Sequence, residues 1–313
     1  MLPATGSDQH TERMGSSLTT IGLPVALGII MFGLGLTLTP ADFGRVAKHP
    51  KAVVIALVCQ LVLLPALCFG LVLMFGLPPV LAVGMMLLAA SPGGTTANLY
   101  SHLFRGDVAL NISLTAINSV IAVVTLPIIV NFSLDYFMAA DDQIGFQFGK
   151  SVEVFAIVLL PVAIGMIVRA LRPAFARSMD KPVRIASVII LIVVIAGSIV
   201  SNRVLLAENF GQLSLITVVF CLCSLALGYL LPRTLAVSRS QSIASSFEIG
   251  IHNATLAIVI AQTVIGSVEM SLPAGVYGVL MFFLAAGFGF LIRGRSGQNV
   301  ADIPASGSPS ASS

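Results

Sequence analysis

The sequence has no tryptophan, only four cysteines, and little charge: Asp, Glu, Lys and Arg together make up 9% of its 313 residues. A soluble protein of this length needs a larger charged surface, so a soluble globular fold is excluded. The cysteines lie within apolar segments and show no Cys-x-x-Cys spacing, which favours small buried side chains over a redox or metal motif. The formal charge of +3 does not indicate a nucleic-acid partner, because the basic residues lie in short loops rather than in one patch.

The chain is instead rich in apolar sequence, with 57% hydrophobic residues. Runs of about 20 mostly apolar residues, separated by Pro, Gly and charge, predict an all-α polytopic membrane protein with about nine transmembrane helices. We expect a polar segment over 1–16, a transmembrane domain over 17–295 and a disordered tail over 296–313. The expected spans are 18–38, 51–75, 78–103, 107–132, 150–171, 183–202, 210–231, 238–264 and 272–292.

The distribution of lysine and arginine predicts the orientation. With the N-terminus outside, 13 of the 16 basic residues fall on the cytoplasmic side, and only Arg13, Lys150 and Arg203 fall outside. Cytoplasmic loops carry an excess of basic residues, so we expect a multi-pass protein of the cell (inner) membrane with its C-terminus in the cytoplasm. An outside N-terminus then requires an odd number of spans, which supports nine.

A first interruption lies in the expected span 78–103, where the sequence reads Ser-Pro-Gly-Gly-Thr-Thr-Ala-Asn over 91–98. Pro92 has no N–H and clashes with the preceding turn, and Gly93 and Gly94 relax the backbone further, so the helix should open there. Opened backbone at membrane depth is tolerated only where it is buried in protein or lines a wet cavity.

A second interruption, Phe-Glu-Ile-Gly-Ile-His-Asn-Ala-Thr over 247–255, contains the one carboxylate that we place at mid-membrane, Glu248. A carboxylate at that depth is costly unless it is paired or neutralised, and no Arg or Lys lies at matching depth. A proton or a bound metal cation is therefore its expected partner. The structural alternative is a protonated glutamic acid that packs by hydrogen bonding.

Neutral polar side chains could complete an oxygen cage around such a cation. They include Gln60 in the second span, Asn98 after the first interruption, and one helical face of the fourth span with Asn111, Thr115, Asn118 and Ser119. Amide, hydroxyl and carbonyl oxygens with one carboxylate suit a hard monovalent cation. Each amide or hydroxyl taken alone fits an interhelical hydrogen bond better than a cation site, so the hypothesis depends on the whole set together with the carboxylate. Two interrupted helices, one in each half of the chain, are typical of a carrier built from inverted repeats with a midplane site.

At these residues the chain resembles the bile acid:sodium symporter family, over Gly28–Leu38, Ser91–Thr115 and Glu248–Asn253. The resemblance implies an inverted-repeat core with two crossing broken helices (51–132 and 210–292) and a smaller panel domain (18–38 and 150–202). It also implies sodium-coupled import of a small or amphipathic organic anion by alternating access.

The resemblance further implies two sodium ions behind the crossing and substrate contacts at Thr95 and Asn253. The first ion would be bound by Asn98, Asn111, Thr115 and Glu248, and the second by Gln60, Glu248, the carbonyls of Ile249 and Ile251, and His252. Two positions depart from the family pattern. Ala97 stands where relatives can have serine, and His252 stands where glutamine is common, so a proton could replace the second sodium.

Three other functions compete with this interpretation. A proton-coupled organic-anion carrier would use Glu248 and His252. An intramembrane hydrolase would need mid-membrane aspartates, a Ser–His pair or a His-Glu-x-x-His motif; the expected spans contain no mid-membrane Asp and no such motif, so we expect no enzyme. A passive channel would show fluxes that do not saturate. We expect the lipid bilayer and a small organic anion as partners, and no obligatory protein partner.

Overall fold

The structure is a computed structural model that describes residues 49–138, 148–179 and 203–293, with scattered positions between 28 and 44 and between 181 and 193. Across these residues the regular structure is helical, and the only β contact is an isolated bridge. The predicted segments 1–16 and 296–313 lie outside the described residues, as do most of the predicted spans 18–38 and 183–202.

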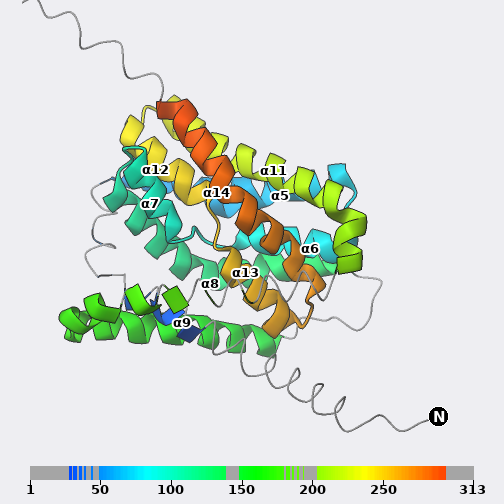
Figure 1. The fold of residues 1–313 in the computed structure, drawn as a ribbon, viewed down its shortest axis with the longest axis horizontal. Helices are drawn as coiled ribbons and strands as arrows, with labels where there is room; N and C mark the ends of the chain where they lie inside the picture. The colour runs from blue at the N-terminus through cyan, green and yellow to red at the C-terminus, as the bar shows by residue number, and fades with distance from the viewer. Residues whose placement is uncertain are drawn as a thin grey trace, which may run out of the picture.

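The long helical elements fall within or around the predicted spans (Figure 1). In chain order they are α4 (Pro50–Val58), η3 (Cys59–Leu63), α5 (Leu64–Phe75), α6 (Pro79–Ala90), α7 (Thr96–Leu103), α8 (Val108–Met138), α9 (Phe148–Leu171), α11 (Arg203–Thr234), α12 (Arg239–Gly250), α13 (Ala254–Val259), η4 (Ile260–Ile265), η5 (Glu269–Ser271) and α14 (Leu272–Arg293).

By length and composition, three continuous helices of the described residues could each cross a membrane: Pro50–Phe75, Ala207–Thr234 and Glu269–Arg293. The bent α8 makes a fourth when its two halves are taken as one span. The elements α6 with α7, and α12 with α13 and η4, are each interrupted, as the two polar motifs predict.

Two helices extend beyond the predicted spans. The helix α8 continues to Met138 rather than ending at 132, and α11 begins at Arg203 rather than at 210. Both extensions contain polar residues, and apolar sequence marks the length of a span rather than the end of its helix. The axis of α8 also turns by 54° at residue 123. Pro127 lies four residues later and cannot donate to the carbonyl of that residue, which accounts for the bend.

The first described span contains a π-helical turn, η3, between α4 and α5. Pro65 follows this turn and has no N–H, so the regular hydrogen-bond register cannot continue through it. The widened turn contains Gln60, which is 3% exposed. The sequence thus places an irregular turn at the one buried glutamine of this helix.

The helix α9 runs along one side of the other helices in Figure 1, where it contacts α8 and η4. It also packs against the short described part of the first span. A Cβ built on Gly35 would lie 3.0 Å from the Cα of Gly165, so the two backbones meet at glycines. Small residues allow such close approach of helices within a membrane.

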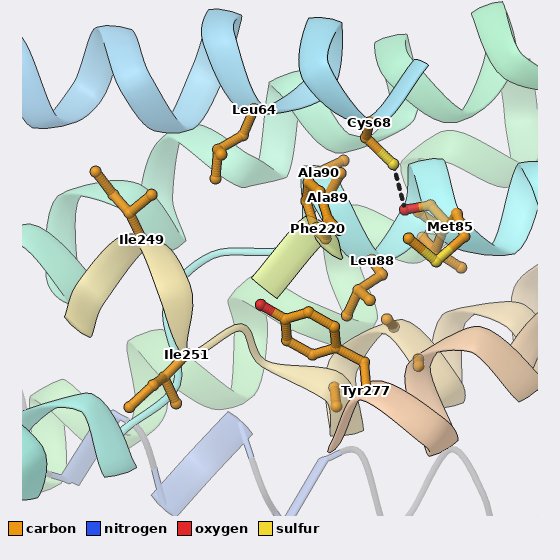
Figure 2. Close-up of a cluster of buried hydrophobic side chains, with 14 of the residues drawn as sticks. Leu64, Cys68, Met85, Leu88, Ala89, Ala90, Phe220, Ile249, Ile251 and Tyr277 are labelled. Carbon is orange, nitrogen blue, oxygen red and sulfur yellow. Dashed lines mark hydrogen bonds between the residues drawn. The ribbon is translucent and has the colours of Figure 1, made fainter. Parts of the chain in front are cut away.

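The apolar core lies between α5, α6, α11 and α14, close to both interruptions. Figure 2 shows Leu64, Met85, Phe220 and Tyr277 converging from these helices, and each is fully buried. The sulfur of Cys68 donates to the carbonyl of Met85, at 3.4 Å. This confirms the interpretation of that cysteine as a small buried side chain.

Candidate functional site

The two helix interruptions lie directly against each other. An antiparallel bridge pairs Gly93 with His252. The backbone N–H of Gly94 donates to the carbonyl of Ile251 at 2.7 Å, and the N–H of Asn253 donates to the carbonyl of Pro92 at 2.9 Å. The opened backbones therefore satisfy each other, as a buried break requires. Positions about 160 residues apart in the sequence form one crossing.

The second interruption needs no proline, because its surroundings hold it open. A Cβ on Gly250 would collide with the side chain of Leu225, so only glycine allows α12 to pack this closely on α11. The carbonyl of Gly250 accepts the hydroxyl of Tyr277 at 2.8 Å instead of a helical N–H. Asn253 then caps α13, where its side-chain oxygen accepts the N–H of Leu256 at 3.0 Å.

Glu248 lies at the end of α12, next to the crossing, and is completely buried. Its hydrogen-bonding side chains are neutral: Thr115 donates to Oε2 at 2.5 Å, and Asn118 donates to Oε1 at 3.2 Å. No lysine or arginine of the described residues forms an ion pair with it. A charged carboxylate buried in this way is unstable without a cation.

The backbone of Gly93 lies against the same carboxylate. A Cβ built on Gly93 would collide with the Oε1 atom of Glu248 and would lie 2.7 Å from its backbone oxygen. The first interruption therefore brings bare backbone up to the acidic side chain of the second. The φ angle of Gly93 is not positive, so its backbone conformation does not require glycine. Glycine is required here because the backbone approaches the carboxylate so closely.

Several buried acceptors around the crossing have no hydrogen-bond partner in the described structure. They are Gln60 Oε1, Asn98 Oδ1, Asn111 Oδ1, Asn118 Oδ1 and His252 Nε2. Buried polar atoms are almost always paired, so such a group of free acceptors indicates a place for a cation or an ordered water. Apart from Asn118, each of these residues belongs to the predicted sodium sites.

The first predicted sodium site is assembled from three helices. Asn111 on α8 donates from Nδ2 to Ser101 Oγ on α7 at 2.9 Å and to the carbonyl of Ala244 on α12 at 2.7 Å, which leaves its Oδ1 free. Because α7 and α8 run antiparallel, Asn98, one turn before Ser101, lies level with Thr115. Hydrogen bonds connect Asn111 and Thr115 to α12, which carries Glu248, and Asn98 lies on α7 three residues before the Ser101 that Asn111 contacts.

Two residues of the second predicted sodium site, Gln60 and His252, meet at the carbonyl of Ser91. Gln60 Nε2 donates to this carbonyl at 3.0 Å, and His252 Nδ1 lies 3.2 Å from it. A carbonyl only accepts, so the imidazole carries its hydrogen on Nδ1 and presents the free lone pair on Nε2. The ring is held between Phe220 and Tyr277, whose centroids lie 5.5 and 5.4 Å away.

The carbonyls of Ile249 and Ile251, also predicted for the second site, belong to the end of α12 and to the break that follows it. In Figure 2 their side chains point to opposite sides of this segment. The carbonyl of Ile251 already accepts the N–H of Gly94, so a cation would have to share its second lone pair.

The two residues predicted to contact the substrate, Thr95 and Asn253, lie on the two interrupted segments that cross. Thr95 is exposed and precedes the first turn of α7, whereas Asn253 is partly buried and caps α13. Both positions therefore belong to the starts of half-helices, which carry partial positive charge.

Sequence reasoning missed two contributors. Asn118 belongs to the predicted polar face of α8 but to neither predicted site, although its position three residues after Thr115 gives it the same side of the helix. The second missed contributor is the backbone carbonyl of Ser91, whose role cannot be inferred from the serine side chain. Its position immediately before Pro92, where the helix ends, was the available clue, because a carbonyl beyond a helix end needs a new partner.

The donor set suits a hard cation. It consists of one carboxylate with amide, hydroxyl and carbonyl oxygens and a single imidazole nitrogen. Among the described residues, no group of three His, Cys, Asp or Glu side chains could hold a metal ion. With one carboxylate and otherwise neutral ligands, the site therefore suits one or two monovalent cations. It has no nucleophile–base pair.

Several known proteins align with this chain over most of its length. A probable chloroplastic sodium/metabolite cotransporter (BASS2) from Oryza sativa subsp. japonica is 26% identical over 272 residues, which is 87% of this chain and 64% of that protein. The uncharacterized sodium-dependent transporter YocS from Bacillus subtilis (strain 168) is 28% identical over 265 residues, 82% of this chain and 78% of that protein. The ileal sodium/bile acid cotransporter of Homo sapiens is 26% identical over 297 residues, 92% and 84%.

The chain spans slightly less than two thirds of the rice relative. The model of the sodium bile acid symporter family matches residues 24–209, which include the first interruption and the polar face of α8. This is a family of symporters, not of enzymes. The apolar helices of this chain agree with a place in the membrane. With more than half of its length matched, the chain belongs to the sodium bile acid symporter family.

Proposed function

We propose that the protein is a secondary active transporter that couples the import of a small or amphipathic organic anion to sodium by alternating access. The observation that supports this most directly is Glu248: it is fully buried beside the crossing, its side-chain partners are neutral, and Asn118, one of these partners, keeps an unpartnered Oδ1. Such a carboxylate needs a mobile cation, and the names of the relatives specify sodium.

Two sodium sites are proposed. The first consists of Asn98, Asn111, Thr115 and Glu248, with Asn118 added from its contact with the carboxylate. The second consists of Gln60, Glu248, His252 and the carbonyls of Ile249 and Ile251. The organic anion would bind on the other side of the crossing, near Thr95 and Asn253.

The proposed architecture has nine spans in two inverted repeats, with a core (51–132 and 210–292) and a panel (18–38 and 150–202). The helix α9 lies along one side of the remaining helices, which agrees with such a division (Figure 1). The excess of lysine and arginine in the loops assigned to the inside supports a cytoplasmic C-terminus, and we propose the cell (inner) membrane as the location.

The driving force follows from charge. Two sodium ions with one monovalent anion would move one net positive charge inward, which gains about 2.3 kcal/mol per 100 mV of membrane potential before any sodium gradient is added. Binding of sodium at Glu248 would hold the two interrupted helices in the geometry that presents their N-termini to the anion. The core would then move against the panel.

A proton-coupled carrier is the second candidate, because His252 presents a free, buried Nε2 and Glu248 could carry a proton. The two candidates differ in a simple measurement. Thermal unfolding of the purified protein would shift with sodium chloride but not with choline chloride for a sodium-coupled carrier, since a ligand that binds the folded state stabilises it. A proton-coupled carrier would respond to pH and not to sodium.

The decisive variant is Glu248→Gln, which keeps the side-chain shape and removes the charge. We expect it to abolish the sodium-dependent shift, because the amide supplies no compensating charge. Glu208→Gln is the matched control, since Glu208 is exposed on α11. A sodium-dependent shift that survives in Glu248→Gln would contradict the proposed site.

A further inference from the structure

The helix α12 is unusually polar for a buried helix. Its serines 240, 242, 245 and 246 lead from its exposed start towards Glu248. Every residue from Ser242 to Gly250 is nevertheless buried. Ser242 and Ser246 donate to the carbonyls of Ser238 and Leu225, so Ser245 and Glu248 are the polar groups that packing does not explain.

The helix α12 pairs with α8 in a regular parallel register. The N–H of Asp107 donates to the carbonyl of Ser240 at 2.9 Å. Asn111 donates to the carbonyl of Ala244, and Thr115 donates to the carboxylate of Glu248. The two partners of each of these contacts are 133 residues apart, so the three contacts are successive turns of one seam.

The α8 side of this seam carries a polar side chain at every turn. From the end of the helix inward these are the carboxylate of Asp107, the amide of Asn111 and the hydroxyl of Thr115. Asp107 is partly exposed, whereas the other two are buried. The distance along the helix from Asp107 to Thr115 is about 12 Å, at 1.5 Å per residue.

Two acceptors have no partner although they are buried, one on the α8 side of the seam and one on α12 beside it. Asn111 Oδ1 belongs to a residue that is 0% exposed, and Ser245 Oγ belongs to one that is 1% exposed. Ser245 lies three residues before Glu248 and therefore on a similar side of α12. Packing alone does not explain them, because unpaired buried acceptors are costly.

From this arrangement we infer that the seam between α8 and α12 is the route by which the cation passes between Glu248 and the water at the Asp107 end. The inference rests on the proposed function. Asp107 attracts the cation at the mouth, and Asn111 Oδ1 and Ser245 Oγ replace its lost water along the way. Basic side chains also lie at this end: Arg105 is exposed, and Arg239 donates to the carbonyl of Ile292 on α14.

The seam is closed in the conformation described. A Cβ built on Gly106, in the loop before α8, would lie 3.2 Å from the N atom of Ala244, so this loop packs directly on α12 and covers the seam at this end. Passage therefore requires α12 and α8 to part at this end during the transport cycle. A side chain in the seam should then meet water only part of the time, and sodium bound at Glu248 should change that fraction.

The inference is tested by the reactivity of Ser245→Cys in the purified full chain. We expect the cationic reagent aminoethyl methanethiosulfonate to modify this cysteine faster than it modifies the native cysteines, and sodium to slow the reaction severalfold relative to choline. Ser224→Cys is the matched control, because Ser224 is equally buried on α11 but lies outside the seam. Equal reaction rates in the two variants, or no reaction above that of the native chain, would overturn the inference.

The role of Asp107 is tested in the same background with Asp107→Asn. Asparagine still caps α8, so the variant removes the charge and not the fold. A charge about 7.5 Å away along the helix favours a cation over an anion roughly sixfold even at the dielectric constant of water. We therefore expect the ratio of rates with aminoethyl and sulfonatoethyl methanethiosulfonate to fall by about that factor at low ionic strength.

Asp135→Asn, at the opposite end of the same helix, should leave this ratio unchanged. An equal ratio in the native and Asp107→Asn backgrounds would overturn the role of Asp107 at the mouth. Sodium-dependent stabilisation, measured in parallel, separates this result from a failure of the proposed function. If the native chain shows no stabilisation by sodium, both the cation site and the route to it are refuted.

Discussion

The crossing can be perturbed most selectively at Gly93, where a single methyl group enters the contact between the two interruptions. An alanine Cβ would meet the carboxylate of Glu248 and would lie 2.7 Å from its backbone oxygen. Contacts this short are not tolerated, and the backbone oxygen cannot swing away as a flexible side chain can. Over-packing of this kind costs about 1–3 kcal/mol.

We expect Gly93→Ala to act on sodium binding as well as on stability. The methyl group would push the carboxylate away from Thr115 and Asn118, so that the first proposed sodium site would lose its charged ligand. If this displacement destabilises the sodium-bound state by about 1.4 kcal/mol, the half-saturating sodium concentration rises tenfold. Thermal unfolding of the purified protein over a sodium titration measures both effects.

Gly70→Ala is the matched control, because Gly70 lies on α5 and a methyl group added there would have nothing within 4 Å of it. Replacing a helical glycine by alanine at an open position should stabilise by about 0.5–1 kcal/mol and leave the sodium titration unchanged. If Gly93→Ala unfolds and titrates like Gly70→Ala, the contact between Gly93 and Glu248 does not hold in the protein.

Two further substitutions separate binding from packing. Thr115→Val removes the hydroxyl that donates to Glu248 at 2.5 Å. Because a hydrogen bond to a charged group contributes about 1.5–3 kcal/mol, we expect the half-saturating sodium concentration to rise by about tenfold or more. Thr125→Val, whose hydroxyl bonds only to its own helix, should leave this concentration unchanged, and an equal effect of both variants would count against the site. Tyr277→Phe removes the hydroxyl that donates to the carbonyl of Gly250 and should lower the free energy of unfolding by about 1 kcal/mol. In a melting experiment, sodium should still stabilise this variant. Loss of the sodium response would show that this contact belongs to the site.

The positions of both interruptions could be predicted from the sequence, but for different reasons. Pro92 and the two glycines that follow it state directly that the helix cannot continue. The second interruption was inferred from the polar residues around Glu248, and the reason for its glycine is a packing contact: Gly250 has no room for a side chain beside Leu225. Sequence alone does not contain that contact.

The partners of the opened backbone could not be predicted at all. Carbonyls and N–H groups are the same in every residue, so nothing in the sequence indicated that Gly94 would bond to Ile251, or that the carbonyl of Ser91 would be the point where Gln60 and His252 meet, although the family resemblance had assigned these two residues to one site. The polar face of α8 was predictable, because its spacing follows the helical repeat. Its register against α12 was not, because the two helices are far apart in the sequence.

The backbone bonds at the crossing have a mechanical consequence. Pulling the two interrupted helices apart would leave two N–H groups and two carbonyls, including those of Gly94 and Asn253, without partners in a dry interior. Each stranded group would cost about 1–3 kcal/mol. We therefore expect the two interrupted helices to stay joined at the crossing, so that a large motion of one carries the other with it.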